Sequence, residues 1–209
     1  MNIKYIFFDM GYTLVDETEV WKKRCEEQAE KEEAKKLNLK ASDLLDLISK
    51  ASSLYKEQFR YVMNELNIKD IVPYDPSLET LYIDTIDTLK YLSKKYKLGI
   101  IANQIEGLNE RLVKLKIDKY FKVVISSSDY KLYKPDLNIF KLGLKMFNAD
   151  PKETIYVGDR LDNDIYPAKK LGMKTIQIKK GFAIVQKPKN KDFEPDLVIN
   201  NLSELIDIL

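Results

Sequence analysis

Three apolar runs of the sequence are each followed by residues that can do chemistry. Asp9 follows YIFF, Ala102 and Asn103 close KLGIIAN, and Asp159 follows TIYVG. One aspartate after a strand is more often a turn former or a helix cap. Two carboxylates at one sheet edge repel each other unless a cation lies between them, and carboxylate oxygens suit Mg²⁺. Lys134, in the segment SSSDYKLYKPD, is a further candidate, because a lysine there keeps a nucleophilic aspartate ionised and binds anions.

The fold must bring these residues together, and the sequence pattern predicts how. Short β-branched or aromatic runs alternate with helical segments, which is typical of βαβ units on a buried parallel sheet. In such Rossmann-like α/β sheets, ligands bind beyond the carboxyl ends of the strands. The expected strands are KYIFFD, KLGIIAN, KVVISS, TIYVGD, KTIQIK and DLVINN.

A long helical interval separates the first strand from the second. From about Glu17 to Lys69 the sequence is charged and helical in its apolar spacing, and a helix is expected again around Leu81 to Lys95. We therefore expect two or more helices inserted into an α/β core. The predicted division is a core of residues 1–15 and 80–209 and a helical cap of residues 16–79.

Composition narrows the possible functions. The 35 Lys and Arg residues nearly balance the 33 Asp and Glu residues, so we expect no nucleic-acid partner and no membrane binding. The chain has no histidine, which removes serine–histidine catalysis and the usual zinc ligands. A single cysteine, Cys25, forms no intramolecular disulfide and fits a cytoplasmic protein. We expect a monomer or a homodimer.

The order of four motifs resembles that of the haloacid dehalogenase superfamily of hydrolases. These motifs are FFDMGYTL, LGIIANQ, KPDLNIF and YVGDRLDNDIYPAKKLGM, and the last contains the GDxxxxD pattern. The resemblance covers the core, about residues 1–15 and 80–209, and the inserted helices resemble the cap of many members.

The resemblance implies roles for five residues. Asp9 matches the nucleophile that becomes a transient aspartyl phosphate, and Lys134 the lysine that stabilises the transferring phosphoryl group. Asp159 matches a ligand of Mg²⁺, and Asp164 the carboxylate that orients the metal's waters or the lysine. The carbonyl of Gly11 would also face the metal, although a glycine there is equally compatible with a simple turn.

Two positions depart from the superfamily pattern. Gly11 stands where phosphatases usually carry a second aspartate, a general acid whose absence could cost about 10²- to 10⁴-fold in rate. Ala102 stands where a serine or threonine usually binds the phosphate. Backbone N–H groups around Ala102 and Asn103, and the Asn103 amide, remain able to bind its oxygens.

Three functions stay open at this point. The first is Mg²⁺-dependent hydrolysis of a small phosphate ester, slow or restricted to good leaving groups. The second is 2-haloacid dehalogenation, which needs no leaving-group acid, and the third is a ligand-binding or regulatory protein with little turnover. Candidate substrate contacts in the inserted helices are the cationic and aromatic residues Trp21, Lys22, Arg24, Tyr55, Arg60 and Tyr61.

Overall fold

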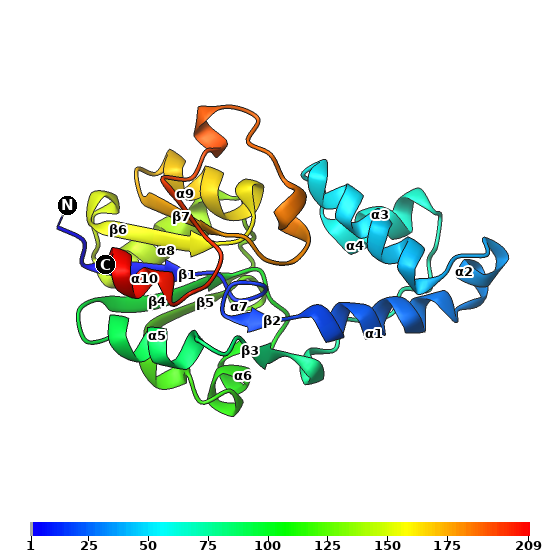
Figure 1. The fold of residues 1–209 in the computed structure, drawn as a ribbon, viewed down its shortest axis with the longest axis horizontal. Coiled ribbons are helices and arrows are strands. Elements are labelled where there is room, and N and C mark those ends of the chain that lie inside the picture. The colour runs from blue at the N-terminus through cyan, green and yellow to red at the C-terminus, as the bar shows by residue number, and fades with distance from the viewer. Residues whose placement is uncertain (1) are drawn as a thin grey trace. The chain divides into compact units, whose positions relative to one another are not determined.

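A computed structural model describes residues 2–209, which form two compact units (Figure 1). The first unit contains the chain up to Val15, Leu81–Lys180 and Pro188–Leu209. The second contains Asp16–Thr80 together with Gly181–Lys187. This division differs from the predicted one at Thr80 and at Gly181–Lys187, which we expected in the core.

The first unit is built on a six-stranded parallel sheet with the strand order β5-β4-β1-β6-β7-β8. The predicted Rossmann-like α/β class is therefore confirmed, and every expected run contributes a strand. The strands are β1 (Tyr5–Phe8), β4 (Lys97–Ala102), β5 (Phe121–Ser126), β6 (Thr154–Gly158), β7 (Lys174–Ile178) and β8 (Leu197–Ile199).

Helices cover both faces of this sheet. Successive side chains of a strand point to opposite faces, so Ile6 and Phe8 pack on one side and Phe7 on the other. The first face is covered by α5 (Thr85–Leu92), α6 (Leu108–Lys114) and α10 (Glu204–Ile208), and the second by α8 (Leu137–Phe147) and α9 (Tyr166–Lys170). A four-residue helix, α7 (Ser127–Tyr130), follows β5. Helix α5 is shorter than the expected Leu81–Lys95, because Leu81 belongs to a strand and the helix already ends at Leu92.

The central strands place functional residues at one edge. Strand β1 lies between β4 and β6, and Phe8 is in register with Ile100 and Val157. Beyond the end of β1, the Asp9 N–H donates a hydrogen bond of 2.9 Å to the carbonyl of Val157. The residues that follow β1, β4 and β6 therefore emerge side by side, as expected for parallel strands.

The second unit is helical, as the apolar spacing predicts. Its helices are α1 (Thr18–Ala29), α2 (Glu32–Lys36), α3 (Ala41–Ser53) and α4 (Gln58–Glu65). Gly181–Lys187 contributes a 3₁₀ turn, and the Gln186 amide donates to the carbonyl of Ser52 at 3.1 Å. Two short paired strands, β2 (Val15–Asp16) and β3 (Thr80–Leu81), carry the chain into and out of the helical interval. Across residues 2–209, no helix has the length and apolar character needed to cross a membrane.

Candidate active site

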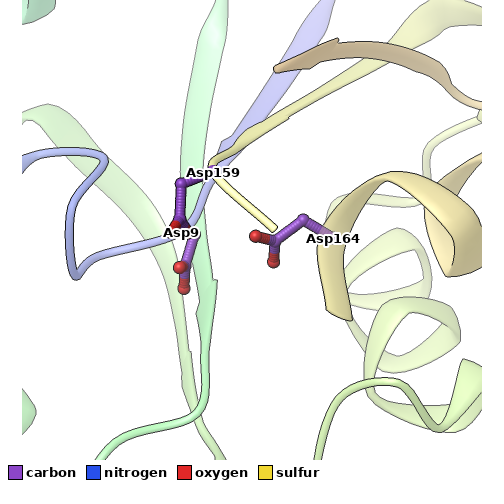
Figure 2. A group of neighbouring side chains, drawn as sticks. All are labelled: Asp9, Asp159 and Asp164. Carbon is purple, nitrogen blue, oxygen red and sulfur yellow. The ribbon is translucent and has the colours of Figure 1, made fainter. Parts of the chain in front are cut away.

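Three aspartates meet at the carboxyl edge of the sheet (Figure 2). Asp9 follows β1, Asp159 follows β6, and Asp164 lies on the π-helical turn Leu161–Ile165 that leads into α9. One carboxylate oxygen from each residue lies within 4.8 Å of the other two. All three residues are buried, with at most 8% of their surface exposed. The structure thus brings together the two predicted strand-end carboxylates and a third one.

Lys134 completes this cluster from the loop before α8. Its Nζ donates to Asp9 Oδ1 at 2.6 Å and to Asp164 Oδ1 at 2.5 Å. The side chain of Lys134 is only 2% exposed, so water screens these ion pairs little. The lysine that the sequence singled out therefore contacts the candidate nucleophile directly.

Burial dominates the electrostatics of this cluster. Burial, together with the charge of Asp164, raises the pKa of Asp9 to about 6, although Lys134 opposes the shift. Burial and the charges of Asp164 and Asp9 raise the pKa of Asp159 well above its usual range. Burial alone would lower the pKa of Lys134, but the two neighbouring carboxylates outweigh it and the pKa is raised. One ammonium group thus lies among three carboxylates and donates to two of them, Asp9 and Asp164, which leaves the cluster short of positive charge.

The donor set fits a hard divalent cation. Among the described residues, no side-chain or backbone hydrogen-bond donor contacts the Asp159 carboxylate, although only 5% of the residue is exposed. A buried carboxylate without a hydrogen-bond donor is costly unless a cation compensates it. Oxygen ligands alone, with no histidine or cysteine, match Mg²⁺ rather than a softer metal.

Backbone contacts hold the aspartates in place. A Cβ atom on Gly158 would lie 2.5 Å from Asp164 Cγ, so only glycine leaves room for that side chain. The Arg160 N–H donates to Asp164 Oδ2 at 2.9 Å. The buried Gln177 amide, on β7, donates to the Asp159 carbonyl at 2.9 Å. The need to leave room for the Asp164 side chain therefore explains the glycine of the GDxxxxD pattern in this chain.

The Asn103 side chain, at the end of β4, contacts the backbone of Lys134. The Asn103 amide donates to the Lys134 carbonyl at 2.9 Å and its oxygen accepts from the Lys134 N–H at 2.7 Å. Ala102 is buried beside Ser126 of β5. Gln104, which follows Asn103, donates its N–H to Ser127 Oγ and accepts a hydrogen bond from that hydroxyl at its carbonyl oxygen. The Asn103 side chain, predicted to bind substrate, is thus already engaged with Lys134.

Three further predicted residues belong to the turn after β1 and to the helical unit. Gly11 lies two residues after Asp9, in the turn that follows β1, and forms an isolated bridge with Val15. Trp21 is buried in the helical unit, where its ring packs against Phe59 and its Nε1 donates to Glu17 at 3.0 Å. Arg60 is exposed on α4 of the same unit. Substrate contacts by Trp21 and Arg60 therefore stay predictions.

One residue of the cluster was missed by the sequence analysis. Tyr156, buried in β6, accepts a hydrogen bond of 3.1 Å from Lys134 Nζ and donates one of 2.7 Å to the Ile101 carbonyl. In the sequence it reads as one more apolar strand residue. The available signal was its hydroxyl, since a tyrosine buried in a central strand needs a hydrogen-bond partner.

Comparisons with known proteins agree with this architecture. The family described as "Haloacid dehalogenase-like hydrolase" matches residues 6–178. A protein of Methanocaldococcus jannaschii named "Glyceraldehyde 3-phosphate phosphatase" is 34% identical over 231 residues, covering 99% of this chain and 97% of that protein. Its namesake in Pyrococcus furiosus is 32% identical, covering 100% of this chain and 93% of that protein.

Solved structures show the same fold. An HAD phosphatase from Thermococcus onnurineus has a TM-score of 0.69 at 24% identity and covers 99% of this chain and 97% of its own. A 2-haloacid dehalogenase from Pseudomonas syringae has a TM-score of 0.64 at 22% identity, also covering 99% of this chain and 97% of its own. At these identities the likeness concerns the fold alone, because one fold serves several chemistries.

Proposed function

The chain belongs to the haloacid dehalogenase-like hydrolases, and we propose that it is a Mg²⁺-dependent phosphatase acting on a small phosphate ester. The observation that carries this proposal is that the Lys134 ammonium group donates hydrogen bonds to both Asp9 and Asp164 inside a cluster of three carboxylates. That arrangement suits an aspartate that attacks phosphorus beside groups that neutralise phosphate charge.

The proposed reaction has two displacements. An oxygen of Asp9 forms a bond to phosphorus while the ester P–O bond breaks, and its electron pair leaves with the alcohol oxygen, which takes a proton from solvent. Water then attacks phosphorus and gives up a proton to solvent, the bond between phosphorus and Asp9 breaks, and inorganic phosphate is released. Lys134 holds Asp9 ionised and offers positive charge to the phosphoryl group during both steps.

We assign the metal site to Asp9, Asp159 and the backbone carbonyl of Gly11, with Asp164 orienting Lys134 and the water ligands. When bound, Mg²⁺ would neutralise charge on the phosphoryl oxygens. The carboxylates of Asp9 and Asp159 support this assignment because they lie close together and are buried. Backbone N–H groups near Ala102 and Asn103 are assigned to the phosphate oxygens, since Ala102 has no hydroxyl to offer.

The substrate class follows from two arguments. The relatives that are 32–34% identical over nearly the whole chain are named for glyceraldehyde 3-phosphate, which makes this ester the first to assay. Gly11 provides no acid for the leaving group, so an aryl phosphate, the ester of an acidic alcohol, should react faster than this alkyl ester. We also assign to the helical unit, with Trp21 and Arg60, the role of a cap that selects the substrate. If Arg60→Ala leaves the KM for two different esters unchanged, this role of Arg60 is wrong.

Dehalogenation fits the cluster less well. Unless Mg²⁺ or the lysine compensates, an anionic haloacid would meet three carboxylates and one ammonium group, and like charges disfavour its binding, whereas the proposed phosphatase reaction includes the Mg²⁺ that neutralises phosphate charge. We further propose that the protein is cytoplasmic, because its only cysteine is buried and reduced thiols are usual in that compartment. We also propose that it is a monomer or a homodimer. Size-exclusion chromatography with light scattering tests the oligomeric state.

The deciding assay measures phosphate release from glyceraldehyde 3-phosphate and from an aryl phosphate. Wild-type protein should release phosphate with Mg²⁺ and stop when EDTA is added. Asp9→Asn should fold normally and lose activity by at least about 10³-fold, because the amide is not a nucleophile. Halide release from 2-haloacids without phosphate release, or full activity in Asp9→Asn, would contradict the proposal.

A further inference from the structure

Residues of the sheet and its edge form hydrogen bonds with both the backbone and the ammonium group of Lys134. We propose that Tyr156 and Asn103 are positioning residues that hold Lys134 against Asp9. The Tyr156 side chain acts on the ammonium group and the Asn103 side chain on the Lys134 backbone, so neither side chain needs to contact the substrate. The inference rests on the proposed function for its kinetic consequences, but the positioning of Lys134 by these two residues can be tested without turnover.

Tyr156 completes the hydrogen bonding of the ammonium group. Lys134 Nζ has three hydrogens and three acceptors, which are Asp9 Oδ1 at 2.6 Å, Asp164 Oδ1 at 2.5 Å and Tyr156 Oη at 3.1 Å. The Tyr156 hydroxyl lies 2.7 Å from the Ile101 carbonyl oxygen and 3.3 Å from Asp164 Oδ1, and its single hydrogen favours the shorter contact. That bond orients the hydroxyl so that a lone pair faces the lysine. The ammonium group is therefore tethered to the end of β4 through a single hydroxyl.

Asn103 fixes the other end of the lysine. Its side-chain amide pairs with both the N–H and the carbonyl of Lys134, at 2.7 and 2.9 Å. Such a two-point contact holds the Lys134 backbone as a neighbouring strand would hold it. Lys134 lies in a loop 31 residues further along the chain, and loops are more mobile than the strands they connect. Asn103 therefore ties a loop residue to β4, one residue past its end.

Together the two contacts define the direction of a long side chain. A lysine has four rotatable bonds and loses considerable freedom when it is ordered. Fixing the backbone through Asn103 and the ammonium group through Tyr156 reduces the number of arrangements that the side chain can adopt between its ends. A lysine held in this way already lies where charge develops on the phosphoryl group, which lowers the barrier without strengthening substrate binding.

Kinetics separate positioning from substrate contact. Tyr156→Phe keeps the ring that packs against Phe140 and removes only the hydroxyl. We expect kcat for an aryl phosphate to fall about tenfold or more, with KM changed less than about twofold. The matched control is Tyr5→Phe, which removes a hydroxyl from the neighbouring strand β1 that is not a partner of Lys134, and it should leave kcat unchanged.

Asn103→Ala removes both backbone contacts and should lower kcat by about tenfold or more, again with little change in KM. Its control is Asn109→Ala, at an exposed asparagine of α6. In a Lys134→Ala background, neither Tyr156→Phe nor Asn103→Ala should lower kcat further, because both act through Lys134. A rise in KM at constant kcat, or a further loss of kcat in that background, would overturn the proposal.

The ammonium group itself gives a readout that needs no activity. In protein labelled with ¹⁵N on lysine, wild type should show one slowly exchanging ammonium resonance that Lys134→Ala removes. Tyr156→Phe should broaden or abolish this resonance, and Asn103→Ala should shift it. An unchanged resonance in both variants, or no protected resonance in wild type, would refute the positioning of Lys134 by Tyr156 and Asn103. If the resonance responds as expected but no phosphate ester is hydrolysed, this positioning is supported and the proposed function is wrong.

Discussion

The Asp164 side chain lies directly over Gly158, so that a Cβ at position 158 would approach Asp164 Cγ to 2.5 Å. Gly158→Ala must therefore push Asp164 away from Lys134, and we expect a loss of about 1–3 kcal/mol in the free energy of unfolding together with a large fall in kcat. Gly99→Ala is the control, because a Cβ there meets the Phe7 ring, also at 2.5 Å, inside the apolar core. Urea titrations and kinetics on both variants check this: equal losses of kcat would show that the space over Gly158 has no special role.

The Asp159 carboxylate should lower the free energy of unfolding when no cation is bound. Its carboxylate is buried beside Asp9 and Asp164 without a hydrogen-bond donor among the described residues, so Asp159→Asn relieves a repulsion. In EDTA at pH 7, the variant should unfold with a free energy at least about 1 kcal/mol higher than wild type. Mg²⁺ should stabilise wild type but not the variant. Exposed Asp129→Asn serves as the control, and a variant that Mg²⁺ stabilises as much as wild type would remove Asp159 from the metal site.

The raised pKa of Asp9 gives a pH dependence with a definite sign. Burial raises this pKa from 3.8 to about 6, so between these values the folded protein keeps a proton that the unfolded chain has released. The contribution of Asp9 to stability is therefore full below pH 3.8 and is lost as the pH rises through about 6. Without metal, the stability of Asp9→Asn relative to wild type should grow by about 1–3 kcal/mol from pH 4 to pH 7. Chemical unfolding at each pH measures the difference, and a difference that shrinks with rising pH contradicts this sign.

Gly11 tests whether a missing acid limits the rate. The described residues with positive φ include Tyr12 but not Gly11, so the backbone at position 11 accepts a side chain. Gly11→Asp should raise turnover of an alkyl phosphate more than that of an aryl phosphate, since only the alkyl alcohol needs a proton to leave. The gain should reach about 10²-fold at most, the lower end of what a general acid contributes.

The control for this substitution is Gly11→Ala, which adds a side chain without a carboxyl group. If alanine preserves folding and aryl-ester turnover while aspartate brings no selective gain on alkyl esters, another group of the protein already supplies the proton.

The sequence predicted the sheet well and the internal support of the site poorly. Buried parallel strands have continuous apolar runs, so β1 and β6 could be located along with the aspartates that follow them. Contacts such as that of Asn103 with the Lys134 backbone join residues far apart in the chain, and no local pattern encodes them. The return of Gly181–Lys187 to the helical unit was missed for the same reason. Tyr156 was missed because apolar periodicity does not distinguish a tyrosine that packs from one whose hydroxyl binds a lysine.

The central claim is that Asp9 carries the phosphoryl group, and chemical trapping tests it most directly. Borohydride reduces an acyl phosphate to an alcohol, so quenching the protein with borohydride during turnover of a phosphate ester with Mg²⁺ should convert Asp9 to homoserine. Peptide mass spectrometry should find this conversion at Asp9 in wild type and lose it in EDTA. Phosphate release without any reduction at Asp9, or with reduction at another carboxylate, would contradict the account.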